Sequence, residues 1–160
     1  MLFRSIGLDV RCDYLCRKSF LHFLLCQIAT DIEANAVEAA KRNAATAGVE
    51  QVIDFSVRDY ADTPLPEGGG VIVLNPAYGE RMGEIETLTA VYKGIGDFFK
   101  QKCKGFMGYV FTGNPALSRK VSLKPKRSLQ FYNSGIECRL LEYELYEGTR
   151  KFKKEKPKPE

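Results

Sequence analysis

An asparagine, a proline and a tyrosine follow a short apolar run in an arrangement suited to holding an aromatic amine. The run is Val71 to Leu74, and Asn75-Pro76-Ala77-Tyr78 comes directly after it. A strand that stops at an Asn-Pro pair delivers an amide to the carboxyl edge of a sheet, where open α/β folds bind ligands. Asn75 and the Pro76 carbonyl can accept from an exocyclic amino group, and a planar base can stack on Tyr78. A plain strand-to-loop turn also explains these residues, because Asn, Pro and Gly favour turns.

Two aspartates follow other apolar runs in the same way. Asp31 ends the run Phe23 to Thr30, and a carboxylate there can bind both hydroxyls of a ribose. Asp59 follows Val52 to Val57, where an acid can accept from the amino group of an adenine. Each acid also has a simpler explanation that needs no ligand. Asp31 would be favoured at the start of a helix by the helix dipole, and Asp59 would cap a turn. Because the ends of parallel strands share one edge, the two acids and Asn75 together predict an adenosine site beside an amine-holding pocket.

The elements that must position these residues form an α/β pattern. Ala34 to Ala47 is rich in good helix formers, and Gly48 stands where a C-terminal cap belongs. Apolar residues between 85 and 99 recur at helical spacing, although Gly94 and Gly96 weaken the middle. Further strands are expected at 105–112, at Leu129 to Tyr132 and at Ile136 to Tyr146, the last two forming a hairpin. This order predicts a Rossmann-like, doubly wound and mostly parallel sheet closed by an antiparallel hairpin.

Basic residues gather in the last third of a chain whose net charge is only +4. Residues 147–160 hold six basic residues against three acids. Residues 117–127 hold no acid and five basic residues, namely Arg119, Lys120, Lys124, Lys126 and Arg127. Such clustering suits a polyanion partner such as RNA. A solvated loop followed by a disordered tail is the alternative.

The five cysteines are odd in number and scattered, which favours a reducing compartment and predicts a cytoplasmic protein. The apolar run from Phe20 to Ala29 is too short to cross a bilayer, so we predict no membrane association. Cys12, Cys16, His22 and Cys26 have spacings that could gather four zinc ligands. An ordinary helix explains the same spacings, because each pair lies one turn apart, and we predict no metal.

Several segments resemble the class I S-adenosylmethionine methyltransferases. They are Thr30-Asp31-Ile32-Glu33, the helix Ala34 to Ala44, Arg58-Asp59, and Asn75 to Arg81. More closely, they look like the THUMP-associated group that methylates guanine N2 in large-subunit ribosomal RNA. Tyr132 to Leu140 is similar to the terminal hairpin of that group. The resemblance covers roughly residues 29 to 146.

The resemblance implies an S-adenosylmethionine-dependent RNA methyltransferase whose partner is ribosomal RNA. It gives no basis for inferring a protein partner. Asp31 would bind the cofactor ribose, Asp59 would bind the adenine, and Asn75, Pro76 and Tyr78 would position the guanine. The full expected cofactor set is Asp31, Ile32, Asp59 and Asn75, and Arg81 joins the five basic residues as an RNA contact. The guanine amine would displace the methyl group directly and lose its proton afterwards, so positioning carries most of the catalysis.

Two features depart from the family pattern. Ala77 stands where a second proline is usual, which leaves the donors and acceptors of the loop in place. The family also begins with a strand followed by a Gly-x-Gly loop around the methionine end of the cofactor, whereas Gly7 is the only glycine among the first 47 residues. In the fold of that family the first strand lies in the middle of the sheet, between the strands that end at Asp31 and Asn75. Either Met1 to Val10 replace it imperfectly, or it is missing because the chain is a truncated form whose N-terminus is foreign to the family. In both cases we expect weak or absent cofactor binding.

We therefore expect three regions in the chain. Residues 1–22 are predicted to be an N-terminal segment foreign to the family, residues 23–146 a partial catalytic domain, and residues 147–160 a disordered basic tail. A non-catalytic RNA-binding remnant of the same family is the competing interpretation, and it rests on the basic cluster and the tail.

Overall fold

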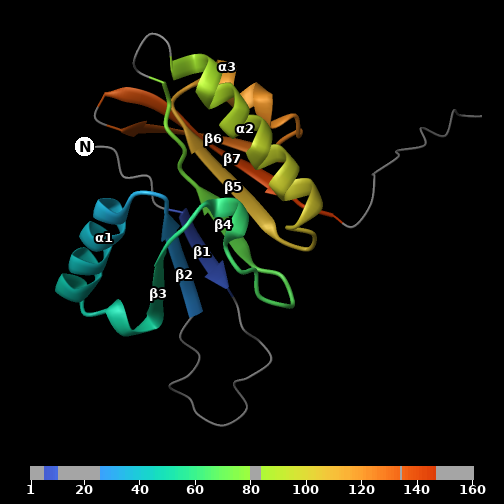
Figure 1. Ribbon diagram of the computed structural model, residues 1–160. Coiled ribbons are helices and arrows are strands. Elements are labelled where there is room, and N and C mark those ends of the chain that lie inside the picture. The colour runs from blue at the N-terminus through green and yellow to red at the C-terminus, as the bar shows by residue number, and fades with distance from the viewer. Residues whose placement is uncertain (1–5, 11–25, 80–83, 134, 147–160) are drawn as a thin grey trace, which may run out of the picture.

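The computed structural model describes residues 6–10, 26–79, 84–133 and 135–146. Among these residues, seven strands form one sheet in the order β3-β2-β1-β4-β5-β7-β6 (Figure 1). The strands are β1 (Ile6–Val10), β2 (Cys26–Asp31), β3 (Ile53–Val57), β4 (Val71–Leu74), β5 (Met107–Thr112), β6 (Arg127–Asn133) and β7 (Ile136–Glu144). The α-helices are α1 (Ala34–Ala47), α2 (Glu84–Gln101) and α3 (Pro115–Ser118). Short 3-10 helices are η1 (Glu50–Val52), η2 (Tyr60–Asp62) and η3 (Arg119–Val121).

The predicted α/β sheet with a closing hairpin is confirmed, but the described sheet is mixed rather than mostly parallel, because β1 runs antiparallel to both of its neighbours. β2 pairs with β3 in parallel, β4 pairs with β5 in parallel, and β7 lies antiparallel between β5 and β6. The first long helix begins and ends at the predicted residues, Ala34 and Ala47. Gly48 ends it with a φ of 72°, the left-handed conformation that glycine adopts without strain, and its N–H donates to the last turn.

The middle of the sheet holds a strand to which the sequence pattern gave no assignment. β1 lies between β2 and β4, where the family resemblance led us to expect a first strand, and it is antiparallel to both. Ile6 pairs with Thr30, whereas Val10 pairs with Cys26. The carboxyl end of β1 therefore lies at the opposite edge of the sheet from the carboxyl ends of β2 and β4.

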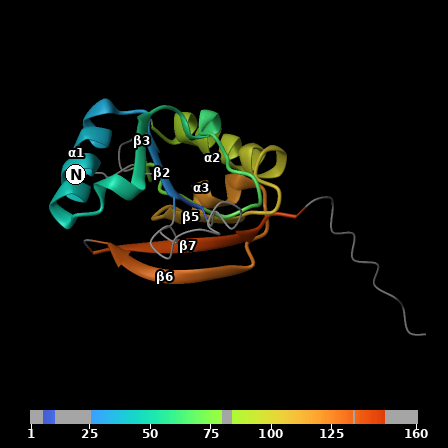
Figure 2. The ribbon, with the colours of Figure 1, turned by 90° about the horizontal axis from the view of Figure 1, so that it is seen from below.

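Helices cover the two faces of the sheet at different places. α1 connects β2 to β3 and contacts both strands, whereas α2 connects β4 to β5. Figure 2 shows α1 and α2 on opposite sides of the sheet. The main core lies between α2 and the sheet, where Ile72, Tyr92, Phe99 and Val110 are completely buried. This core fixes the end of β4 against α2, and the Asn-Pro segment begins at that point.

Within the described residues, we find no helix with the length and apolar character required to cross a bilayer. The expected foreign N-terminal segment lies outside the described residues except for β1. The expected basic tail, residues 147–160, lies wholly outside them.

Candidate functional site

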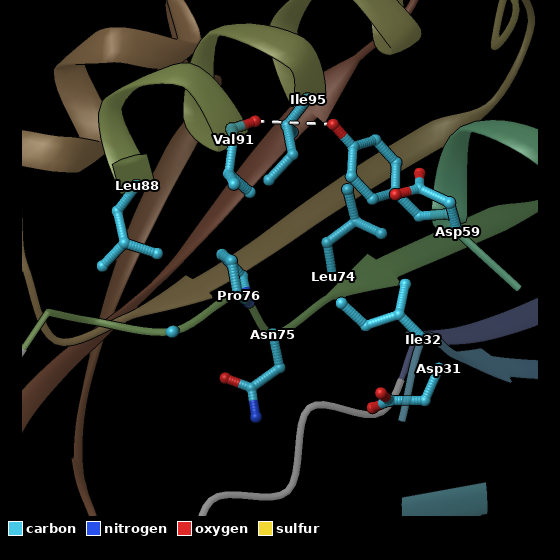
Figure 3. Close-up of a pocket in the computed structure, with 11 residues that line it drawn as sticks. Asp31, Ile32, Asp59, Leu74, Asn75, Pro76, Leu88, Val91 and Ile95 are labelled. Atoms are coloured by element: carbon cyan, nitrogen blue, oxygen red, sulfur yellow. Dashed lines mark hydrogen bonds between the residues drawn. The ribbon is translucent and has the colours of Figure 1, made fainter. Parts of the chain in front are cut away.

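The structure brings the three predicted strand-end residues around one pocket. Asp31 is the last residue of β2, Asp59 follows β3, and Asn75 follows β4. The cavity has a volume of about 130 Å³. Its walls are Asp31, Ile32, Asp59, Tyr60, Leu74, Asn75, Pro76, Ala77, Leu88, Val91 and Ile95. Figure 3 shows Asp31 and Asn75 at one side, Asp59 at the other, and Ile32 and Leu74 between them.

Asp31 is held in place by the start of helix α1. Its side chain is 5 % exposed, and Oδ1 accepts a hydrogen bond from the backbone N–H of Glu33 at 2.8 Å. This bond closes a turn between the strand and the helix, which explains an aspartate at this position without a ligand. The same residue also lines the pocket, so the structural role does not conflict with a ligand-binding role. The next residue, Ile32, is exposed and also lines the pocket.

Asp59 caps the short helix η2. Its Oδ1 accepts from the N–H of Ala61 at 2.8 Å, which is the turn-capping role considered above. The neighbouring Tyr60 forms part of the pocket wall, and its hydroxyl donates to the carbonyl of Val91 at 3.4 Å (Figure 3). Burial, with smaller contributions from the carboxylates of Asp59 and Asp97, raises the pKa of Tyr60 to about 12. Tyr60 is therefore a neutral hydroxyl at physiological pH, and it connects the Asp59 turn to α2.

The Asn-Pro segment differs in one respect from its expected arrangement. Asn75 and Pro76 line the pocket as expected, but Tyr78 does not. The Tyr78 side chain is 8 % exposed, and its ring meets Phe111 edge-on with centroids 6.3 Å apart. Its hydroxyl donates to Oδ1 of Asn75 at 2.8 Å. In this arrangement the ring offers little surface for a base to stack on, and its contact with the site is through Asn75.

The pocket has an apolar wall that the sequence did not predict. Leu88, Val91 and Ile95 of α2 line the pocket, and they recur at the three- and four-residue spacing of one helix face. That spacing predicted the helix, but it does not distinguish a core face from a pocket wall. The pocket therefore combines an apolar interior with polar groups at the strand ends, which is the usual composition of a small-molecule site.

The structure divides the predicted basic cluster. Arg119 and Lys120 lie in η3, which packs against α2. Lys126 forms an ion pair with Glu144 at 3.0 Å, and its N–H donates to the carbonyl of Glu142. The paired segment of β7 lies toward the start of β5, away from the pocket edge. Arg127 begins β6 beside Lys126, Lys124 is exposed in the preceding loop, and Arg81 lies outside the described residues.

Across the described chain, no group of three or more histidine, cysteine, aspartate or glutamate side chains is arranged to hold a metal ion. Cys12, Cys16 and His22, three of the four considered zinc ligands, lie outside the described residues. The zinc alternative therefore stays untested by this structure.

Comparison with known proteins identifies a matching family. The family described as UPF0020, RMKL-like, methyltransferase domain matches residues 8–142. A ribosomal RNA large subunit methyltransferase K/L from Syntrophotalea carbinolica is 35 % identical over 135 residues, which cover 82 % of this chain and 19 % of the relative. This chain thus spans about one fifth of the length of that relative.

Solved structures show the same fold. A possible methylase from Clostridium difficile superimposes with a TM-score of 0.68 and is 27 % identical, with 76 % of this chain and 32 % of that chain covered. A putative methyltransferase complexed with SAH gives a TM-score of 0.67 at 23 % identity, covering 75 % of this chain and 32 % of the other. At that identity the second likeness concerns the fold alone.

Proposed function

Because this chain belongs to the family of RMKL-like methyltransferase domains, we propose that it transfers a methyl group from S-adenosylmethionine to an amino group of RNA. The acceptor class we favour is guanine N2 in large-subunit ribosomal RNA. The name of the Syntrophotalea carbinolica relative supports a ribosomal RNA substrate. The SAH held by the putative methyltransferase of the same fold is the demethylated form of this donor.

The convergence of Asp31, Asp59 and Asn75 around one pocket is the observation that carries the proposal. Asp31 would hold the ribose hydroxyls and Asp59 the adenine amino group, since carboxylates accept from both. Ile32 and the apolar wall of α2 would enclose the adenine ring. At about 130 Å³, the cavity suits one ring system rather than a complete cofactor. The cavity is therefore assigned to the adenine ring of the donor, with the ribose at Asp31 on its rim.

The chemistry requires accurate positioning more than a strong base. When bound, S-adenosylmethionine supplies a methyl group on a positively charged sulfur, so an acceptor nitrogen can displace a neutral thioether directly. Asn75 and the carbonyl of Pro76 would accept from the acceptor amino group and direct its lone pair. Tyr78 would act through its hydrogen bond to Asn75, which restricts the orientation of the amide. The amine can release its proton after the carbon–nitrogen bond has formed.

The methionine end of the donor fits less well. A loop around it would have to leave a central strand at the pocket edge, but the carboxyl end of β1 lies at the opposite edge. The antiparallel direction of β1 supports the expectation that cofactor binding by this chain is weak. It also favours one second candidate, an RNA-binding protein of this family that does not transfer methyl groups.

We also propose residues 23–146 as the catalytic region and the cytoplasm as the location. The match of the family over residues 8–142 supports the first. Among the described side chains, the cysteines Cys103 and Cys138 are free and buried, which accords with a reducing compartment and supports the second.

The test uses the whole chain, labelled S-adenosylmethionine and large-subunit ribosomal RNA that lacks the modification. We expect N2-methylguanosine in the digested RNA, identified by mass spectrometry. Asn75→Ala should remove most of this product, because it deletes the side chain that orients the acceptor. Asn43→Ala is the matched control, since Asn43 is exposed on α1 and does not line the pocket.

Normal methyl transfer by Asn75→Ala would refute the assigned role of the Asn-Pro segment. RNA binding without any methyl transfer by the wild-type chain would favour the second candidate. Calorimetry with S-adenosylmethionine separates a weak cofactor site from a defective acceptor site. A weak cofactor site reduces the heat of cofactor binding, whereas a defective acceptor site leaves that heat unchanged.

A further inference from the structure

A second cavity lies at the same edge of the sheet, on the side of β5 that faces away from β4. It has a volume of about 240 Å³, slightly below the ~300–1,000 Å³ of typical ligand pockets. Its walls come from the end of β5, from α3 and from β7: Thr112, Gly113, Pro115, Ser118, Glu137 and Arg139. The first pocket has only acidic charged residues in its wall, Asp31 and Asp59, whereas this one has an ion pair, Glu137 and Arg139, whose charged atoms lie 3.0 Å apart.

An exposed aromatic ring adjoins this cavity. Tyr132 of β6 pairs in register with Glu137, and Gln130 pairs with Arg139. Residues paired across neighbouring strands point to the same face of a sheet, so Tyr132 and Gln130 lie beside the two charged residues of the cavity. The Tyr132 side chain is 73 % exposed, the largest exposed fraction among the exposed large hydrophobic residues of the described chain. Gln130 donates to its hydroxyl at 3.0 Å, which restrains the ring along the strand.

The two pockets are joined by a continuous set of contacts. The hydroxyl of Tyr92 donates to the carbonyl of Ala77, a wall of the first pocket, at 3.2 Å. The same hydroxyl lies 2.7 Å from Oγ1 of Thr112, a wall of the second. A Cβ placed on Gly113 would come within 3.1 Å of the Tyr78 ring, so the end of β5 packs directly on the Asn-Pro segment. The second cavity is thus the immediate neighbour of the residues that hold the acceptor amine.

We propose that the second cavity and Tyr132 bind a nucleotide adjacent to the methylated base in single-stranded RNA. This inference rests on the proposed function, because it extends the substrate site along the RNA. A largely exposed ring suits base stacking, which tolerates any base, and the Arg139 guanidinium suits a phosphate. Arg119 and Lys120 follow Ser118 directly and add positive charge beside the α3 wall. Glu137 limits the attraction of Arg139 for phosphate because it already pairs with it.

The test measures the affinity of the whole chain for a fluorescent single-stranded RNA oligonucleotide by anisotropy. Tyr132→Ala should weaken binding by about tenfold, since stacking is the lost interaction. Tyr132→Phe should bind nearly as well as wild type, because the ring remains. Leu129→Ala is the matched control: Leu129 is also exposed on β6, but on the opposite face.

The charged pair gives effects of opposite sign. Arg139→Gln should weaken binding and reduce the salt dependence by about one phosphate contact. Glu137→Gln should strengthen binding, because it removes the acid that competes with phosphate for Arg139. A purely structural role for this ion pair predicts the same direction of change for both variants, and that result would overturn the phosphate assignment.

Several outcomes overturn the proposal as a whole. They are wild-type affinity in Tyr132→Ala, an equal loss in Leu129→Ala, and no RNA binding by the wild-type chain at low salt. Polyphosphate, which has charge but no bases, should bind Tyr132→Ala and wild type equally, and a loss there would also refute stacking. The experiment distinguishes failure of this proposal from failure of the proposed function. RNA binding that depends on Tyr132 but occurs without methyl transfer would count against the methyltransferase activity and would still support the nucleotide site.

Discussion

The hydroxyl of Tyr78 donates to Oδ1 of Asn75 at 2.8 Å, and this bond fixes which way the amide faces. Asn114 strengthens the arrangement, since its Nδ2 donates to the Tyr78 carbonyl at 2.9 Å. Asn114 itself caps α3 through its Oδ1. The acceptor side of the pocket is therefore tied to the segment that follows β5. Tyr78 is better placed to orient Asn75 than to offer its ring to a base.

Tyr78→Phe tests that relationship. The variant keeps the edge-on contact with Phe111 but loses the bond to Asn75, so the orientation of the amide is less restricted. A neutral hydrogen bond contributes ~1 kcal/mol, so we expect the turnover rate to fall by about fivefold to tenfold, with the cofactor affinity unchanged. Single-turnover methyl transfer and calorimetry measure the two quantities separately. An unchanged rate would show that the base, when bound, orients Asn75 without help from Tyr78.

Asp31→Asn separates charge from local structure. The asparagine retains an Oδ1 that can accept from the N–H of Glu33, so the turn into α1 should survive and the unfolding midpoint should change little. It loses the carboxylate that would accept from both ribose hydroxyls, and charge-assisted bonds are stronger than neutral ones. We expect about a tenfold lower affinity for S-adenosylhomocysteine by calorimetry. Equal affinities of variant and wild type would remove Asp31 from the cofactor site.

The strand-end part of the site could be predicted because its signals are local. Asp31, Asp59 and Asn75 each follow an apolar run, and parallel strands bring their ends to one edge by geometry alone. The helix Ala34–Ala47 was predicted to the residue, because composition and the Gly48 cap agree. Family resemblance then supplied the expected roles, which this structure leaves as predictions.

Other parts depend on contacts between segments that are distant in sequence. The residue pattern alone gave β1 no assignment, because five residues containing a glycine and an aspartate give too weak a strand signal. Only the family resemblance offered Met1 to Val10 as a replacement for the first strand, and the antiparallel direction of β1, which depends on its neighbours, was not predicted. The second cavity joins β5, α3 and β7, and no single stretch carries a motif for it. The burial of Tyr78 depends on Phe111 and Gly113, and both lie in a different part of the chain.

Gly96 lowers the helix propensity of α2, but a close contact with another segment of the chain requires a glycine at this position. A Cβ at this position would overlap the carbonyl oxygen of Val121 and lie 2.9 Å from its carbonyl carbon. Gly96→Ala should therefore destabilise the protein by ~2 kcal/mol despite the better helix propensity of alanine. Urea unfolding gives the free energy change.

Gly94→Ala is the matched control on the same helix. Its Cβ would meet chiefly the Tyr60 hydroxyl, at 2.7 Å, which is the far end of a side chain that can rotate away. We expect a smaller effect on stability and a measurable one on cofactor affinity, because Tyr60 lines the pocket. A larger loss of stability for Gly94→Ala than for Gly96→Ala would contradict the packing argument.

Buried tyrosine hydroxyls make the stability of the fold sensitive to alkali. Burial raises the pKa of Tyr92 from 10.0 to about 12, with an opposing contribution from its hydrogen bond to Thr112. Above about pH 10 the unfolded chain releases this proton while the folded chain retains it, so the unfolded state gains stability. The free energy of unfolding should be constant with respect to this group below pH 10 and should fall between about pH 10 and 12, by at most ~3 kcal/mol.

Urea unfolding at a series of pH values between about 8 and 12 measures this fall directly. Tyr92→Phe should be less stable at neutral pH, because it loses the bonds to Ala77 and Thr112, yet its stability should decline less steeply above pH 10. Parallel declines in Tyr92→Phe and wild type would mean that another group causes the alkaline loss, and Tyr143, whose pKa burial also raises to about 12, would be the next to replace.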